Sequence, residues 1–316
     1  MIKDIHLLEA ALRAGGLIPD SITAGGLQRC KAEGDKGSKR SGAYRLFDDE
    51  IPTCIWWNWK TSDMGVWVST DRPLTDVDRN RHRQLMEQAK RERQQEQAVQ
   101  WAANREYLVR LWDNAEPLTA SCPAGAYLER RGLVVPNTDA LRYMPKLDYW
   151  DGAMLIDSFP AMLAAVTDNE GALVNVHRTY LNQGGDKARV PTVKKLCKSA
   201  GPMAGASIKL GQPAVRRDGR QGLGVAEGIE TAIAATILAG VPVWSCVSAH
   251  GLASFEPPRD IHHLYVFADN DESQTGQKAA ADLGNRVARM GLSVRILTPE
   301  TVGDWNDELL ARRAAV

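Results

Sequence analysis

The sequence predicts an α/β protein: a C-terminal parallel sheet with flanking helices, preceded by a basic α+β segment and a small β-rich N-terminal module. Three observations predict this. From Leu223 onward, apolar strand-like runs alternate with helical runs, which is typical of a parallel sheet covered on both faces. Earlier in the chain, two stretches concentrate Lys and Arg. The first 72 residues alternate apolar and polar positions between Gly- and Asp-rich turns, as antiparallel strands do.

Composition sets the limits of these predictions. The 316 residues allow roughly two or three domains at about 100–200 residues each. With 44% hydrophobic and 25% charged residues, the chain has the proportions of a globular protein and not those of a disordered or fibrous one. No apolar run approaches the roughly 18 residues of a membrane span, and the N-terminus lacks a signal-peptide core. We therefore expect a cytoplasmic protein without a membrane partner.

The five cysteines exclude two further classes of small domain. They are odd in number, widely spaced and contain no CxxC pair. This pattern favours free thiols in a reducing compartment over a disulfide framework or a zinc ribbon.

The N-terminal module is expected over residues 1–72. A short helical start precedes four alternating segments, LQRCK, AYRLF, TCIWWNW and GVWV, which predict an antiparallel sheet. Six basic residues stand against two acidic ones between Arg29 and Arg45, and four of the nine tryptophans follow. Proteins that bind single strands stack bases on aromatic rings and place phosphates on cations. Candidate contacts of this kind are Lys39, Arg40 and Trp57.

A structural role for these tryptophans is the alternative, because a module this small needs large side chains for its core. Strand alternation places Trp56 and Trp57 on opposite faces of the sheet. Residues 73–123 follow as a helical connector. Within them, 76–112 contains neither Pro nor Gly, and its first half has a poor apolar stripe, so we expect an exposed helix.

Residues 124–220 form the predicted basic subdomain. AYLERRGL predicts a short helix closed by Gly132, and FPAMLAAVTDNEGALVNVHRTYL predicts two strands around an Asn-Glu-Gly turn. Between Arg178 and Lys198 there are six basic residues and one acidic residue. A solvated basic face is the plain interpretation of such a cluster, and phosphate binding is the functional one. The candidate nucleic-acid or nucleotide contacts are Arg178, Lys187, Arg189, Lys194 and Lys195.

Residues 221–316 form the predicted parallel-sheet domain, and acidic residues follow its strands. Glu227 ends the first strand, and Asp269 and Asp271 end the third; Asp304 precedes the last helix. Ligands of such sheets bind beyond the carboxyl ends of the strands. Clustered carboxylates repel one another and are matched by Mg²⁺ or Mn²⁺, which prefer oxygen ligands. Helix capping and turn formation are the alternative for each acid taken singly.

These residues carry a family resemblance. VAEGIETAIAA, followed by VFADND and GQKAA, resembles the Toprim domain of primases, topoisomerases and certain nucleases. The basic stretch DNEGALVNVHRTYLNQGGDKARV is similar to the template-facing part of bacterial-type primase cores, and DWNDELL to the signature that closes that core. The segment from LQRCK to WNWKT is similar to the N-terminal part of Toprim primases from conjugative plasmids and phages.

The resemblance implies a DNA primase of plasmid or phage replication that makes short RNA primers on single-stranded DNA. It implies catalytic and metal roles for Glu227, Asp269 and Asp271 with Mg²⁺ or Mn²⁺, nucleoside triphosphates as substrates, and a replicative helicase as a separate partner. Where many relatives have an Asp three residues after the Toprim Glu, this chain has Glu230. Two alternatives remain open: a Toprim nuclease, and a non-catalytic single-strand-binding accessory protein.

Overall fold

The computed structural model describes residues 4–48, 51–61, 63–69 and 75–315. The chain forms two compact units, residues 1–98 and 99–316. The sequence suggested four segments, and its first boundary, at residues 72 and 73, lies outside the described residues. The other two predicted boundaries, at 123/124 and 220/221, divide the second unit further and stay a prediction.

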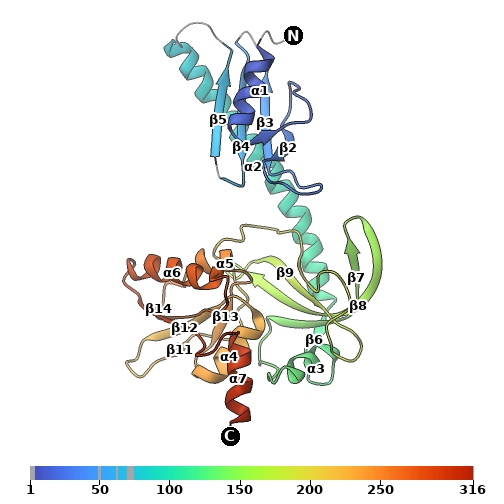
Figure 1. Cartoon of the computed structure of the whole chain (residues 1–316), viewed down its shortest axis with the longest axis vertical. Helices are drawn as coiled ribbons and strands as arrows, with labels where there is room; N and C mark the ends of the chain where they lie inside the picture. Colours follow the sequence, from blue (N-terminus) through green and yellow to red (C-terminus); the bar gives the residue numbers. More distant parts are fainter. Residues whose placement is uncertain (1–3, 49–50, 62, 70–74, 316) are drawn as a thin grey trace. The chain divides into compact units, whose positions relative to one another are not determined.

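The first unit is a five-stranded antiparallel sheet with its strands in chain order. Figure 1 shows it in blue. Its elements are α1 (Ile5–Ala14), β1 (Leu17–Ile18), β2 (Gln28–Ala32), β3 (Gly42–Phe47), β4 (Thr53–Asn58) and β5 (Asp63–Val68). The four strands predicted from the alternating segments are therefore confirmed, with the short β1 in addition.

Helices contribute to the hydrophobic clusters on both faces of this sheet. Leu8 and Leu12 of α1 pack in one buried cluster with Tyr44. On the opposite face, Trp57 packs with Ala89 of α2 (Asp76–Asp113). Trp56 belongs to the first cluster and Trp57 to the second, which confirms the predicted alternation.

The long helix α2 belongs to both units and is not simply exposed. Its predicted helical span, 76–112, agrees with the observed helix to within one residue. The few apolar residues of its first half, Leu85, Met86 and Ala89, pack on the first unit's sheet. Leu108 and Leu111, near its end, are buried in the second unit. The sparse stripe is thus sufficient to pack the helix at each end.

The second unit begins with an antiparallel sheet in the order β10-β9-β8-β7-β6. Its elements are β6 (Glu116–Pro117), α3 (Pro123–Arg130), β7 (Leu141–Asp151), β8 (Met154–Thr167), β9 (Leu173–Tyr180) and β10 (Lys194–Leu196). The predicted strand pair is β8 and β9. Gly171 closes the turn between them at φ 87°, a left-handed conformation that glycine adopts without strain.

The C-terminal part is the predicted α/β sheet. Its elements are β11 (Ala214–Val215), β12 (Gln221–Ala226), α4 (Ile229–Ala239), β13 (Val243–Ser245), α5 (Ala249–Ala253), β14 (Ile261–Phe267), α6 (Thr275–Ala288), β15 (Ser293–Leu297) and α7 (Trp305–Ala314). Strands β13, β12, β14 and β15 are parallel, whereas β11 pairs antiparallel with the start of β12.

Helices cover both faces of this sheet, as its apolar strands predicted. Side chains of α4 and α7 pack on one face, and those of α5 and α6 on the other. The α4 and α7 cluster also contains Tyr127, Leu141 and Met162 of the preceding segment. The predicted segments 124–220 and 221–316 therefore share one hydrophobic core, and both belong to a single unit. No helix in the described part of the chain is long and apolar enough to cross a membrane.

Candidate functional site

The candidate site lies at the carboxyl edge of the parallel sheet, where Glu227 and Asp269 meet. Ala226 at the end of β12 pairs with Phe267 at the end of β14, in parallel register. Glu227 follows the first strand directly, and Asp269 follows the second after one intervening residue. Because the two strands are neighbours, their acids emerge at the same edge of the sheet, as the sequence predicted.

Glu227 lies between the first turns of two helices. The backbone N–H of Ala249, the first residue of α5, hydrogen-bonds its carboxylate. A Cβ at Gly276, in the first turn of α6, would stand 3.7 Å from Oε2 of Glu227. Burial raises the pKa of Glu227, the Ala249 N–H lowers it, and the negative charge of Asp271 raises it again. The carboxylate is therefore held beside helix N-termini but still feels a second acid.

Asp269 is the most perturbed acid at this edge. Burial raises its pKa to about 6, and the charges of Asp304, Glu227 and Asp271 act in the same direction. The Thr231 hydroxyl donates a hydrogen bond of 3.4 Å to its Oδ1, which opposes the shift. The negative charges of three neighbouring acids thus add to burial in raising the pKa of Asp269.

Asp271 and Asp304 also have the local structural roles that the alternative interpretation assigned to them. Oδ1 of Asp271 accepts hydrogen bonds from the Gln274 backbone N–H (2.9 Å) and the Ser273 hydroxyl (3.0 Å). Asp304 caps α7 through a hydrogen bond of 2.9 Å from the backbone N–H of Asp307. These hydrogen bonds do not use the second oxygen of Asp271, whereas Oδ2 of Asp304 lies 3.7 Å from Arg131.

Glu230 is turned away from these acids, toward the basic subdomain. It is 4% exposed, and it accepts hydrogen bonds from the Tyr127 hydroxyl and from Lys194 Nζ (2.8 Å). Burial raises its pKa, but the charge and hydrogen bond of Lys194, with the hydrogen bond of Tyr127, bring the pKa well below its ordinary value. Lys194, predicted as a phosphate contact, thus has its ammonium in an ion pair with the buried Glu230 of α4.

The other predicted cations of the basic subdomain divide into engaged and exposed side chains. Arg178 donates to the Leu196 carbonyl (2.7 Å), and Lys195 donates to the Trp150 carbonyl (2.6 Å) and lies over the Tyr149 ring. Lys187 and Arg189, between β9 and β10, are exposed. Among the described residues, neither of these two forms an ion pair. They are the side chains of this set that can reach a phosphate without breaking a contact.

His177 of β9 is buried and remains outside the acidic edge. Burial and the nearby charge of Lys194 lower its pKa to about 4, so it is neutral at pH 7. A neutral, buried imidazole of this kind is part of the protein's interior.

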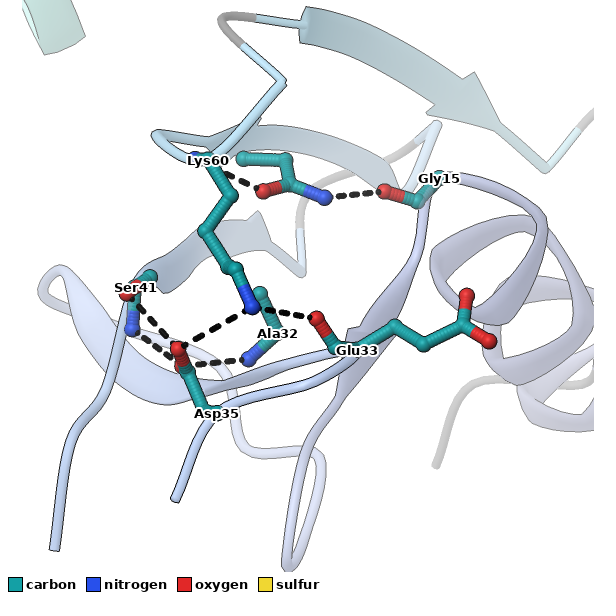
Figure 2. Close-up of polar contacts among 7 residues, drawn as sticks. Gly15, Ala32, Glu33, Asp35, Ser41 and Lys60 are labelled. Carbon is teal, nitrogen blue, oxygen red and sulfur yellow. Dashed lines mark hydrogen bonds and ion pairs between the residues drawn. The ribbon is translucent and has the colours of Figure 1, made fainter. Parts of the chain in front are cut away.

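The N-terminal module holds its basic loop through one carboxylate. Figure 2 shows Asp35 accepting from the backbone N–H of Ala32 (2.9 Å) and from the backbone N–H (2.7 Å) and hydroxyl (2.9 Å) of Ser41. These hydrogen bonds, that of Ala32 foremost, lower the pKa of Asp35 to about 2. Because they join the two ends of residues 36–40, Lys39 and Arg40 are presented on a closed loop.

The three predicted contacts of this module differ in accessibility. Lys39 and Arg40 are exposed, although Arg40 pairs with Asp20 at 3.1 Å. Trp57 is only 8% exposed and lies beneath α2. Most of the Trp57 ring is therefore covered, and only a small part of it is open to a base.

Sequence reasoning missed three residues that contact the predicted ones. Tyr127 bonds Glu230, Thr231 bonds Asp269, and Arg131 lies 3.7 Å from Asp304. Thr231 could have been found, since it stands one helical turn after Glu227 at the start of α4. Tyr127 and Arg131 come from the preceding segment, and no local pattern connects them with these acids.

Comparison with known families identifies the sheet domain. Residues 222–315 match the family of the Toprim domain. They form a Toprim domain. Residues 102–209 match a family described as a domain of unknown function, DUF7146. A comparison with curated proteins found no match.

Solved structures similar to this chain include three DNA primases. A primase domain from Pseudomonas aeruginosa is 14% identical, with 66% of this chain and 74% of that chain covered and a TM-score of 0.44. The primase fragment of the bacteriophage T7 primase-helicase is 17% identical, with 64% and 72% covered and a TM-score of 0.38. The Aquifex aeolicus primase, with its zinc-binding and RNA polymerase domains, is 11% identical, with 99% and 83% covered and a TM-score of 0.41.

The Toprim acids fit a divalent cation in donor chemistry but do not form a closed set of ligands. Carboxylate oxygens suit Mg²⁺ or Mn²⁺, and burial, together with the charges of the neighbouring acids, raises the pKa of Asp269. Within the described ranges, however, no three His, Cys, Asp or Glu side chains stand close enough to hold one metal ion together. Mg²⁺ commonly keeps several waters and takes one or two carboxylates, which such an open arrangement can supply.

Proposed function

We propose that the chain is a metal-dependent nucleotidyltransferase, a DNA primase that makes short RNA primers on single-stranded DNA in plasmid or phage replication. The observation that carries the proposal is the Toprim edge itself: Glu227 and Asp269 at adjacent strand ends, with the pKa of Asp269 raised by burial and by its acidic neighbours. The order of the sequence motifs that resemble primases supports the same activity.

The residues have distinct roles in this proposal. A divalent cation held by Asp269 and Asp271, with Glu227 and Asp304 beside them, would supply positive charge for the triphosphate and the leaving pyrophosphate. Glu227, at the same edge of the sheet as Asp269, would act as a ligand or move a proton. The exposed Lys187 and Arg189 would hold phosphates of the template or of the incoming nucleotide.

The test incubates the purified chain with single-stranded DNA, labelled ribonucleoside triphosphates and Mg²⁺ or Mn²⁺. New labelled oligonucleotides would support a primase. Shortening of the template would instead indicate a nuclease that uses the same acids with water as nucleophile. A template that is bound but unchanged would indicate an accessory single-strand-binding protein. The last two outcomes contradict the proposal.

A first prediction concerns the exposed cations next to the Toprim domain. We expect Lys187→Ala and Arg189→Ala each to lower primer synthesis by about tenfold, since a charge-assisted contact to phosphate contributes on the order of 1.5 kcal/mol. Thermal unfolding should not change, because both side chains are exposed. Lys146→Ala, an exposed lysine on β7, is the matched control. Full activity of both variants would assign them to a solvated face.

A further inference from the structure

A hollow in the first unit lies between the β4–β5 edge and the first half of α2. Its volume is about 540 Å³, within the range of about 300–1,000 Å³ typical of small-molecule sites. It is lined by Trp57, Asn58, Trp59, Asp63, Met64, Met86, Glu87, Lys90 and Arg93. The walls thus combine aromatic and thioether surface with two cations that come from the helix.

Two guanidinium groups converge on one ring of this hollow. Cζ of Arg29 lies 4.0 Å from the centroid of the Trp59 ring, and Cζ of Arg93 lies 5.1 Å from it. Within the described part of the chain, neither arginine is in an ion pair with a carboxylate. Burial lowers the pKa of Arg29, and the charge of Arg93 lowers it further. The two positive charges repel each other, and an anion between or beside them would relieve that repulsion.

The hollow also contains a hydrogen-bond donor that has no partner among the described residues. The Trp59 Nε1–H is buried and has no hydrogen-bond partner within the described residues. Of the two acids on the lining, Glu87 is 3.8 Å from Arg91, which offsets its charge. Asp63 is exposed at the rim. An apolar wall, three cations (Arg29, Lys90 and Arg93) and the indole donor of Trp59 are complementary to a flat ring joined to an anion.

We propose that this hollow binds a nucleotide. Its base would lie against the wall formed by Trp57, Met64 and Met86, and its phosphate at Arg93 and Lys90. The ligand is a nucleotide within a single strand or a free nucleoside triphosphate, which share this chemistry. The inference rests on the proposed function for the choice of these two ligands, and on the hollow for the chemistry of recognition.

The test measures binding of a fluorescein-labelled oligodeoxythymidylate of about 12 nucleotides by anisotropy, and of ATP by calorimetry, to the full chain in EDTA. Arg93→Ala and Lys90→Ala should each weaken binding of one ligand about tenfold. If the oligonucleotide is that ligand, the salt slope of its binding should fall by about 0.7 for each phosphate that the variant no longer neutralises. Alanine is the best helix former, so α2 should remain intact. Arg93→Lys should restore part of the affinity.

Two further variants separate this site from general surface charge. Arg83→Ala removes the same charge from the same helix outside the hollow, and should leave both affinities within about twofold. Asp63→Asn removes a repelling charge at the rim and should tighten binding. A decrease in affinity confined to ATP would assign the hollow to the free nucleotide. Unchanged binding of both ligands by Arg93→Ala and Lys90→Ala would overturn the inference.

Failure of the proposed function would remain distinguishable from failure of this inference. Binding in EDTA excludes a metal at the Toprim acids, so it is measured independently of primer synthesis. If the chain makes no primers but the hollow variants still bind more weakly, the binding site stands without the primase.

Discussion

Asp269→Asn and Asp271→Asn should each lower nucleotide transfer by at least about 10³-fold. Both substitutions preserve size and remove a negative charge from the proposed cation site. Metal-assisted charge stabilisation contributes several kcal/mol to such reactions, and each 1.36 kcal/mol is a factor of ten in rate. Asn at 271 can still accept the hydrogen bonds from Ser273 and Gln274 that shape the turn. The loss of activity should therefore occur without loss of fold.

In the absence of metal, the same Asp269→Asn variant should be more stable than the parent. The difference should develop as the pH rises from about 4 to above 6. The pKa of Asp269 is raised from 3.8 to about 6 in the folded chain, so folding disfavours its ionised form. Near pH 4 the folded carboxyl is protonated and the unfolded one is only about half ionised, so the substitution should have a small effect. As pH rises toward 6 and above, the parent loses stability that the variant keeps. For a half-buried, partly screened group we expect about 1 kcal/mol at pH 7.5.

Thermal unfolding in EDTA at pH 4 and pH 7.5, then at pH 7.5 with Mg²⁺, checks this prediction. Added Mg²⁺ should reverse the order of the two proteins, because it stabilises the parent by binding to the folded state. Glu227→Gln adds a distinction: loss of activity with Mg²⁺ binding retained indicates proton transfer, and loss of both indicates a ligand. Normal primer synthesis by both Asp variants would contradict a mechanism in which these two acids hold the catalytic cation.

The parallel sheet and its acidic edge could be predicted because both depend on local patterns. Apolar runs of strand length mark β12 and β14, and the first polar residues after them mark the strand ends. Parallel pairing then brings Glu227 and Asp269 to one edge whatever the rest of the chain does. The two strands around Gly171 were predictable for a similar reason, since an Asn-Glu-Gly turn separates two β-branched and apolar runs.

Contacts that join distant segments could not be predicted in this way. Trp57 has the pattern of a half-exposed strand residue, but α2 covers it through Ala89, and no local feature of the strand announces that helix. Lys194 belongs by composition to a basic run, yet it meets Glu230 36 residues later. Arg93 comes from a helix that looked like an exposed connector, and it lines a hollow with side chains of β4 and β5. Charge counts identify where cations are abundant, and only the fold shows which of them are already paired.

Lys194→Met should destabilise the second unit by about 2–4 kcal/mol, although Lys194 was predicted as a surface contact to nucleic acid. Its side chain is 41% exposed, but its partner Glu230 is only 6% exposed. Removing one member of a buried ion pair leaves an uncompensated charge, which usually costs about 3–5 kcal/mol, and the partial exposure here lowers that figure. The matched control is Lys195→Ala, because the adjacent lysine contacts the Trp150 carbonyl and the Tyr149 ring and, within the described residues, no carboxylate.

The pH dependence of this variant should have the opposite sign to that of the parent pair. In the parent, Lys194 and Tyr127 lower the pKa of Glu230 from 4.5, so the pair stabilises the fold above that pH and loses its effect as pH falls through the lowered pKa. In Lys194→Met, burial alone should raise the pKa of Glu230, and stability should fall as pH rises above about 4.5.

Adding Glu230→Gln to Lys194→Met removes the unpaired charge and should recover most of the stability, because the Tyr127 hydroxyl can still donate to the Gln oxygen. Urea unfolding of the parent, Lys194→Met, Glu230→Gln and the double variant at pH 4.5 and pH 8 measures this cycle. If Lys194→Met matched the parent in stability at pH 8 and differed only in its affinity for DNA, Lys194 would be a phosphate contact after all, and the ion pair with Glu230 would have no structural importance.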